Sequence, residues 1–314
     1  MGEHVRIQWG GMGAQTMKIA LLQHACSMDK DANVALMGEM AREAAGKGAK
    51  LIVTQELFAT RYFCQAEDDR CFGLAEPIPG PASRKVCELA KELGVWISAS
   101  LFERRAAGIY HNTSIMASPA GEIAGKYRKM HIPDDPRFYE KYYFTPGDLG
   151  FRAQDLGAVK TGMLICWDQW YPEAARLTAM RGAEVLLYPT AIGWYTRTSA
   201  DGGAGTHGET ETTRRQQLAA WRTMQRSHAI ANGVYVAAVN RVGVEGELKF
   251  WGHSFIVEPS GDVIAEAGGE EREILIAEMD RRKIEEQRLG WPFFRDRRID
   301  AYGDLTKRYS EGDV

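Results

Sequence analysis

The sequence predicts an α/β fold, a four-layer α-β-β-α sandwich built from two similar halves. Short apolar runs alternate with longer amphipathic stretches of helical periodicity along most of the chain. This alternation is typical of strands whose faces are covered by helices. Three segments of the first half also recur in the second half, in the same order. The economical arrangement of two such halves places sheet against sheet, with the helices outside.

The elements follow from the length and composition of each run. Apolar runs too short for helices predict strands at residues 18–23, 51–54, 95–101, 159–165, 185–188 and 234–239. Amphipathic segments between them predict helices at residues 32–45, 82–93, 172–181 and 214–232. Pro172 suits the first turn of a helix, and Gly94 and Gly233 suit the position that ends one.

The internal repeat predicts the two halves. "GAKLIV" (48–53) resembles "GAEVLL" (182–187), and "LGVWISAS" (93–100) resembles "NGVYVAAV" (232–239). "SPAGEIAG" (118–125) resembles "EPSGDVIA" (258–265), and both have Pro and Gly where hairpin turns need them. The offsets are 134, 139 and 140 residues. Because no Pro-, Gly- or Ser-rich linker separates the halves, we expect a single domain over residues 17–314.

Composition and charge exclude several classes of protein. The chain has 314 residues, of which 45% are hydrophobic and 26% charged, and its net charge is -3. This balance does not favour a nucleic-acid partner, and no apolar run reaches the roughly 20 residues that span a bilayer. Residues 1–16 lack the strand and helix pattern, so we expect a disordered extension or a cloning remnant there.

The cysteines and histidines indicate a reduced protein without a metal. There are five cysteines, an odd number, and no two form a C-x-x-C pair, which favours a cytoplasmic location over a disulfide framework. The seven histidines are scattered without the spacing of metal ligands. We therefore expect no metal.

A cysteine, a glutamate and a lysine stand at or just beyond predicted strands. Cys166 ends the apolar part of "GMLICWDQWYPE" (162–173), Glu56 follows "KLIVTQ", and Lys129 lies in "GEIAGKYRKMHIP". Reactive groups collect beyond the carboxyl ends of strands in α/β sheets. A base, a lysine and the start of a helix at Pro172 would together activate a thiol. Each residue also has an ordinary explanation, as a core cysteine, a solvated glutamate or a surface lysine, and spacing alone leaves both open.

The chain resembles the carbon–nitrogen hydrolase, or nitrilase, superfamily, and within it the N-carbamoylputrescine amidohydrolases. The resemblance runs from Met17 through nearly the whole chain. Its most specific segments are "QELFATRYFCQ", "KYRKMHIPDDPRFYEKYYFTPGD" and "CWDQWYPEAARLTAMRGAEVLLYPTAIGW". It implies a catalytic triad of Glu56, Lys129 and Cys166, with Glu140 positioning the lysine. It also implies hydrolysis of a ureido C–N bond without a cofactor, in polyamine biosynthesis, by a homo-oligomer.

The substrate must be selected by residues around the pocket. Relatives that act on carbamoyl amino acids carry two arginines after the cysteine, whereas this chain has Gln169 and Trp170 there. The absence of that carboxylate clamp is compatible with an amine tail. The expected substrate-binding residues are Tyr62, Trp167 and Trp194, although packing explains the tryptophans equally well. The acids Asp201, Glu209 and Glu211 are further candidates for an amine, or simply part of a solvated loop.

The C-terminal tail has no clear core pattern. Beyond about residue 280 the charged, aromatic stretch "GWPFFRDRRIDAYGDL" combines surface and apolar character. It would suit packing on another subunit or on its own domain. Together with the resemblance, it leads us to expect an oligomer interface there.

Overall fold

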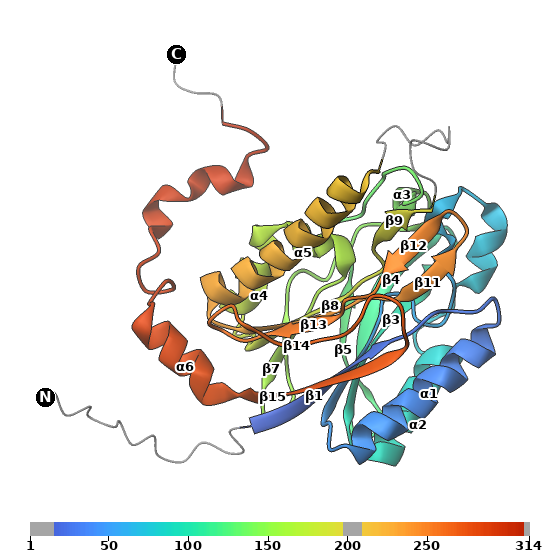
Figure 1. Cartoon of the computed structure of the whole chain (residues 1–314), viewed down its shortest axis with the longest axis horizontal. Helices are drawn as coiled ribbons and strands as arrows, with labels where there is room; N and C mark the ends of the chain where they lie inside the picture. The colour runs from blue at the N-terminus through green and yellow to red at the C-terminus, as the bar shows by residue number, and fades with distance from the viewer. Residues whose placement is uncertain (1–15, 197–208, 311–314) are drawn as a thin grey trace, which may run out of the picture.

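The computed structural model describes residues 16–196 and 209–310, and places two six-stranded sheets face to face between pairs of helices (Figure 1). The expected extension at residues 1–16 lies outside the described residues, apart from Thr16, which begins the first strand. Helices α1 (Lys30–Gly46) and α2 (Pro81–Leu93) cover the first sheet, and α4 (Pro172–Met180) and α5 (Glu211–Asn232) cover the second. The predicted α-β-β-α sandwich is confirmed.

Each sheet has parallel central strands and antiparallel outer ones. The order of the first sheet is β15 (Glu273–Asp280), β1 (Thr16–Gln23), β2 (Leu51–Thr54), β3 (Trp96–Ala106), β4 (Ile109–Ala117) and β5 (Ile123–Arg128). The order of the second is β6 (Ala153–Asp155), β7 (Lys160–Met163), β8 (Val185–Pro189), β10 (Tyr235–Val239), β13 (Phe255–Val257) and β14 (Val263–Glu266). The parallel pairs are β1–β2 and β2–β3 in one sheet, and β7–β8 and β8–β10 in the other. The two sheets therefore share one topology.

The repeated segments occupy matching places in the two sheets. Gly94 and Gly233 end α2 and α5 in the left-handed conformation, with φ of 63° and 55°, as their sequence contexts predict. The "SPAGEIAG" segment makes the turn from β4 to β5, and "EPSGDVIA" makes the turn from β13 to β14. Gly121 and Gly261 sit in these turns at φ of 85° and 91°. The internal repeat thus corresponds to a structural duplication.

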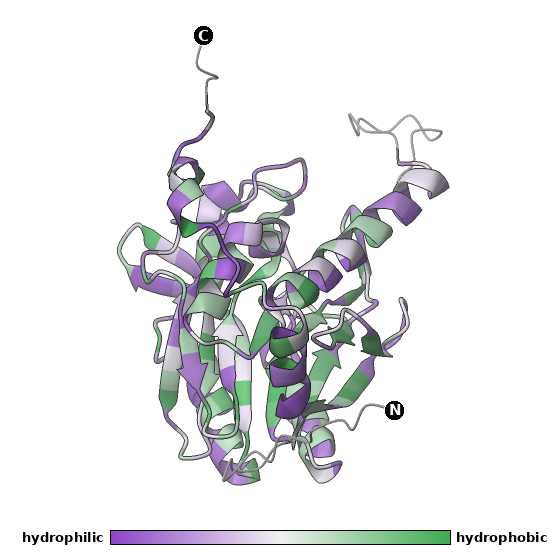
Figure 2. Cartoon of the chain, turned by 90° about the vertical axis from the view of Figure 1, so that its left-hand side faces the viewer, coloured by the Kyte–Doolittle hydropathy of each residue, from purple (hydrophilic) through white to green (hydrophobic). Residues whose placement is uncertain are grey.

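Side-chain alternation along the strands divides the core into layers. In β1, Ile19 and Leu21 belong to the cluster between the two sheets, whereas Ala20 and Leu22 belong to the cluster beneath α1 and α2. Figure 2 shows hydrophobic stretches along the strands of both sheets and hydrophilic stretches along the helices. Over residues 16–196 and 209–310, no helix is both long and apolar enough to cross a bilayer.

Some predicted boundaries differ from the structure. The strand predicted at residues 159–165 ends at Met163, because the chain then turns into a short 3-10 helix, η3 (Cys166–Trp170). Helix α5 begins at Glu211, three residues before the predicted start, because Thr210 caps it by accepting from the Thr213 backbone N–H at 3.1 Å. The remaining elements are a small sheet of β9 (Gly193–Tyr195), β12 (Leu248–Trp251) and β11 (Val242–Glu245), the helices α3 (Glu140–Tyr143) and α6 (Arg281–Gly290), and the 3-10 turns η1 (Phe63–Gln65), η2 (Asp69–Leu74), η5 (Ile299–Ala301) and η6 (Gly303–Thr306).

Candidate active site

A buried lysine lies between two buried glutamates at one edge of the first sheet. Lys129 directly follows β5, Glu56 lies two residues after β2, and Glu140 is the first residue of α3. The Lys129 Nζ lies 2.8 Å from Glu56 Oε1 and 2.6 Å from Glu140 Oε2. None of the three side chains is more than 1% exposed. Three segments that are distant in sequence thus meet at one ammonium group.

The Glu56 carboxylate has one engaged oxygen and one free oxygen. Its Oε1 accepts hydrogen bonds from Lys129 and from Asn112 Nδ2, the latter at 2.7 Å. Its Oε2 is buried and has no hydrogen-bond partner among the residues that the structure describes. Arg241 donates to the Glu56 carbonyl at 2.6 Å and pairs with Glu245, which holds the backbone after β2 in place. Glu56 is therefore fixed, with one oxygen left to take part in chemistry.

Cys166 is the first residue of η3, three residues after the end of β7. Its φ is 41°, a left-handed conformation that costs a non-glycine residue about 1–2 kcal/mol. The side chain is buried, yet it lines a pocket of about 510 Å³ together with Trp167, Trp170 and Glu140. Helix α4 begins at Pro172, as expected, and the rest of η3 lies between Cys166 and this helix start.

The charges around Cys166 favour the neutral thiol. Burial and the nearby Glu56 carboxylate raise the pKa of the Cys166 thiol well above its usual value, and the Lys129 ammonium opposes this only in part. Burial alone would lower the pKa of Lys129, but Glu140 and Glu56 raise it well above its usual value. A protonated thiol beside a carboxylate requires proton removal during attack. The expected stabilisation of a resting thiolate by Lys129 is outweighed by burial.

Glu140 has a carboxyl that titrates close to neutral pH. Burial raises the pKa of Glu140 to about 7, although the Lys129 ammonium lowers it. Tyr62 donates to Glu140 Oε1 at 2.8 Å, which also favours the charged form. The ion pair with Lys129 is therefore sensitive to pH in the neutral range.

The expected substrate-binding residues lie in different places. Trp167 is part of the pocket lining. Tyr62 is buried, and its hydroxyl donates to Glu140, so it contacts the cluster of Lys129 and the two glutamates. Trp194 packs against Trp251 and under the Arg214 guanidinium, because alternation along β9 turns Gly193 and Tyr195 towards the pocket instead. Neither Tyr62 nor Trp194 is among the residues that line this pocket, and their binding of substrate stays a prediction.

The acidic candidates also separate. Glu209 lines the pocket, where it accepts from the Tyr195 backbone N–H at 2.7 Å, and burial raises its pKa. Glu211 is exposed at the start of α5, and Asp201 lies outside the described residues. Asp135, which the sequence did not single out, lines the same pocket. With Glu140, three carboxyl groups therefore line the cavity that contains Cys166.

Gln169 and Trp170, which stand where the relatives that act on carbamoyl amino acids carry arginines, have different surroundings. Trp170 lines the pocket. Gln169 is fully buried and accepts from Trp221 Nε1 at 2.7 Å and from Gln225 Nε2 at 2.8 Å, both on α5. Of the two positions that carry arginine in those relatives, Trp170 therefore faces the pocket, while Gln169 joins η3 to α5.

Asn112 and Arg241 contact Glu56, and no pattern in the sequence indicated either residue. Asn112 lies on β4, a strand too polar to be recognised as one, and Arg241 lies just after β10. Both act through contacts that exist only in the folded chain. In the part of the chain described, no three His, Cys, Asp or Glu side chains are grouped so as to hold a metal ion.

Known proteins resemble this chain over almost its whole length. Residues 18–289 match the family model described as carbon–nitrogen hydrolase. An N-carbamoylputrescine amidase of Solanum lycopersicum is 43% identical over 293 residues, covering 90% of this chain and 93% of that protein. A citrullinase of Francisella tularensis subsp. tularensis is 38% identical, covering 93% and 99%. The crystal structure of a carbon–nitrogen hydrolase from Helicobacter pylori G27 has a TM-score of 0.88 and 44% identity, covering 94% and 100%.

Proposed function

The chain belongs to the carbon–nitrogen hydrolase family, and we propose that it hydrolyses N-carbamoylputrescine to putrescine, ammonia and CO2. The observation that carries the proposal is the buried Glu56–Lys129–Glu140 cluster beside a pocket-lining cysteine. Such a set supplies a nucleophile, a base and a positive charge without a cofactor. The amidase name of the Solanum lycopersicum relative supports the choice of substrate.

The reaction proceeds in two halves through a thioester. The free Oε2 of Glu56 takes the proton of Cys166 while the sulfur attacks the ureido carbonyl carbon. Lys129 and the Trp167 backbone N–H hold the oxyanion, a contribution of about 3 kcal/mol per donor. Collapse of the tetrahedral intermediate breaks the C–N bond to the terminal nitrogen, which leaves as ammonia with the proton from Glu56. A carbamoyl thioester remains on Cys166.

Water then completes the reaction. Glu56 takes a proton from a water molecule, which attacks the thioester carbonyl, and the departing sulfur recovers that proton. The released carbamate loses CO2 and leaves putrescine. Glu140 keeps Lys129 charged and oriented in both halves, since it pairs with the ammonium at 2.6 Å.

The acids around the pocket support a substrate with an amine tail. Glu209 and Asp135 line the cavity, and a carboxylate in a partly buried site attracts an ammonium group more strongly than in water. A substrate that carries a carboxylate at that end, such as a carbamoyl amino acid, would face Asp135 and Glu209, of which Glu209 already pairs with Arg214 at 3.6 Å. This asymmetry favours N-carbamoylputrescine over citrulline and N-carbamoyl-β-alanine.

Ammonia release from a set of ureido compounds and one guanidino compound, agmatine, tests the substrate. We expect N-carbamoylputrescine to give a higher kcat/KM than citrulline, agmatine and N-carbamoyl-β-alanine. A clear preference for either compound with a carboxylate would overturn the assignment and favour an amidase for another small ureido substrate. A catalytically silent binding protein is the remaining alternative. Equal inactivity of the wild type and Cys166→Ala against a broad amide panel would establish it.

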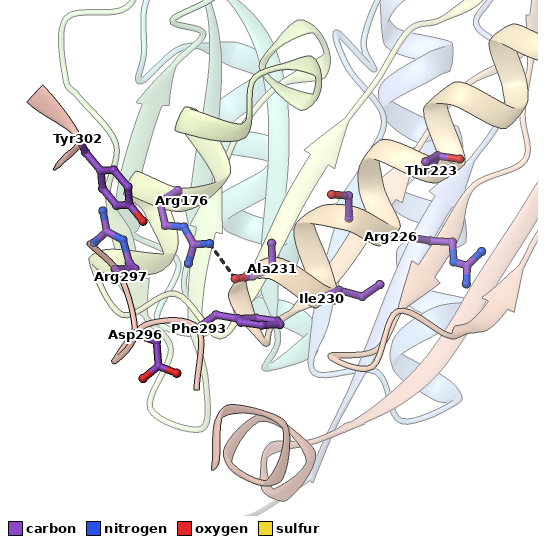
Figure 3. A pocket seen from close by; sticks show the side chains of 10 residues that line it. Arg176, Thr223, Arg226, Ile230, Ala231, Phe293, Asp296, Arg297 and Tyr302 are labelled. Atoms are coloured by element: carbon purple, nitrogen blue, oxygen red, sulfur yellow. Dashed lines mark hydrogen bonds between the residues drawn. The ribbon is translucent and has the colours of Figure 1, made fainter. Parts of the chain in front are cut away.

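The C-terminal tail supports assembly with a second copy of the chain. Trp291, Phe293, Ile299 and Leu305 are exposed, and the tail extends away from the sheets after α6 (Figure 1). Between the tail and helices α4 and α5 lies a groove of about 740 Å³. Figure 3 shows Phe293 and Tyr302 on its tail side and Ile230 on its helix side. Apolar side chains exposed in such number commonly mark a protein interface.

Light scattering after size exclusion tests the assembly. Ile299→Asp with Leu305→Asp should reduce the mass to that of one chain, because charges would enter an apolar contact. Ile109→Asp, at an exposed isoleucine of β4, is the matched control and should leave the mass unchanged. An unaltered mass of the tail variant would exclude this surface.

The cytoplasmic location predicted from the odd number of cysteines remains part of the proposal.

A further inference from the structure

Asp168 is a buried carboxylate close to Cys166. It has no part in the proposed reaction. It lies two residues after Cys166 and is fully buried. Four hydrogen bonds converge on it. Tyr127 Oη donates to Oδ2 at 2.7 Å, and the Ile165 backbone N–H donates to the same oxygen at 3.0 Å. The His131 backbone N–H and Nδ1 lie 3.1 and 2.7 Å from Oδ1.

The donors come from the two segments that carry the lysine and the cysteine. Tyr127 and His131 stand two residues before and two residues after Lys129, at the end of β5 in the first sheet. Ile165 directly precedes Cys166, after β7 in the second sheet. One carboxylate therefore joins the lysine segment to the cysteine turn across the boundary between the two sheets.

We infer that Asp168 is a positioning residue that fixes the Cys166 turn relative to Lys129. Hydrogen bonds to a charged acceptor are stronger and shorter than neutral ones, so four of them define a rigid junction. The turn needs such support, because Cys166 adopts a left-handed backbone conformation that it would not hold unaided. The His131 ring also stacks on Tyr171 at 3.7 Å between centroids, which fixes the direction of its donor.

Two other contacts near the active site make different connections. Gln169 joins η3 to Trp221 and Gln225 of α5, which covers the same sheet as the cysteine. Arg241 holds the backbone of Glu56. Loss of Asp168 should therefore displace the sulfur from the ammonium while leaving the pocket and its acids in place.

The test is Asp168→Asn, which keeps the shape but removes the charge and exchanges one acceptor oxygen for a donor. We expect kcat to fall about 100-fold, the cost of roughly 1 Å of misplacement, with KM changed by less than about 3-fold. The rate constant for iodoacetamide modification of Cys166, followed by peptide mass spectrometry, should fall at least about 10-fold. The alkylation assay needs no substrate, so it tests this inference even if the proposed function, on which the kcat measurement rests, is wrong.

Matched variants separate positioning from general loss of structure. Global destabilisation would accelerate alkylation of the buried Cys26 and Cys64, whereas positioning leaves them protected. Tyr127→Phe removes a single donor and should lower kcat about 10-fold. Tyr188→Phe is its control, since that buried hydroxyl has no hydrogen-bond partner in the described part of the chain, and it should behave as wild type.

The results that overturn the inference are equally definite. A folded Asp168→Asn protein with wild-type kcat and wild-type Cys166 alkylation would do so, as would a defect confined to KM. Should Asp168→Asn fail to fold, Tyr127→Phe decides the question. Wild-type turnover of Tyr127→Phe would then exclude the positioning role, and a loss that Tyr188→Phe does not share would support it.

Discussion

Tyr62→Phe should make activity depend on pH in a new range. The hydroxyl donates to Glu140 Oε1 at 2.8 Å, and the ring packs against Phe138 and Phe250. Phenylalanine preserves the ring and removes only the donor. Because that donor stabilises the charged carboxylate, its loss raises the pKa of Glu140 above its present value of about 7.

The size of the effect follows from the bond. A hydrogen bond to a charged group contributes about 1.5–3 kcal/mol, and one pKa unit corresponds to about 1.4 kcal/mol. The pKa of Glu140 should thus rise by about one to two units. At pH 7 the ionised fraction would fall from about a half to roughly 1–10%, which lowers kcat/KM about 5- to 50-fold. At pH 9.5 the two proteins should differ by no more than about 2-fold, because Glu140 is then ionised in most molecules.

The assay is kcat/KM for ammonia release between pH 6 and pH 9.5, which reports the free enzyme. Tyr188→Phe, another buried tyrosine, controls for the loss of a hydroxyl. A loss of equal size at pH 7 and at pH 9.5 would refute the reasoning, since it would indicate displaced side chains and no altered titration. An unchanged profile would show that Tyr62 does not influence the charge of Glu140.

Three further predictions concern the carboxylates. Glu56→Gln should lower kcat by about 10²- to 10⁴-fold with little change in KM, because the thiol then loses its base, and retention of more than a tenth of the activity would exclude that role. Glu140→Gln should flatten the pH dependence of the free energy of unfolding measured by urea denaturation. In the wild type the Glu140 carboxyl binds its proton more tightly in the folded state than in the unfolded state. Its contribution to the free energy of unfolding therefore decreases as the pH rises from about 4 to about 7. A Glu140→Gln variant whose free energy of unfolding has the same slope against pH as the wild type would contradict the raised pKa. Glu209→Gln should raise KM for N-carbamoylputrescine about 10-fold but leave KM for butylurea, which lacks the amine, unchanged. Glu211→Gln is the control and should change KM for neither substrate. Equal effects of Glu209→Gln on both substrates would argue against a salt bridge between Glu209 and the amine of the substrate.

The fold could be predicted because its central strands are uninterrupted apolar runs. The outer strand β4 escaped prediction because its sequence, "IYHNTSIMA", is polar in the middle. The structure buries these polar residues and pairs them, with Asn112 donating to Glu56 and Thr113 donating to Glu103. A pattern based on hydrophobicity cannot recognise a strand whose buried side chains are satisfied by hydrogen bonds.

The candidate site was predictable only in part, for a related reason. Glu56 and Cys166 stand just beyond predicted strands, so position and resemblance both indicate them, whereas Lys129 follows β5, which was not predicted, and is indicated by its motif. Tyr62 was correctly connected with the site region but not with its contact, because the side-chain direction depends on how the backbone after β2 is held. Asp168 and Arg241 gain their importance from partners far along the chain, which a single sequence does not reveal.

The duplication divides the chemistry between the two copies of the motif. The acids and the ammonium group belong to the first copy and the segment after it, whereas the sulfur belongs to the second. A chain still emerging from the ribosome, or a proteolytic fragment containing either copy alone, therefore has a base without a nucleophile or a nucleophile without a base. Under the proposed mechanism, neither copy alone could carry out the reaction, because the base and the nucleophile meet only when the two copies pack together.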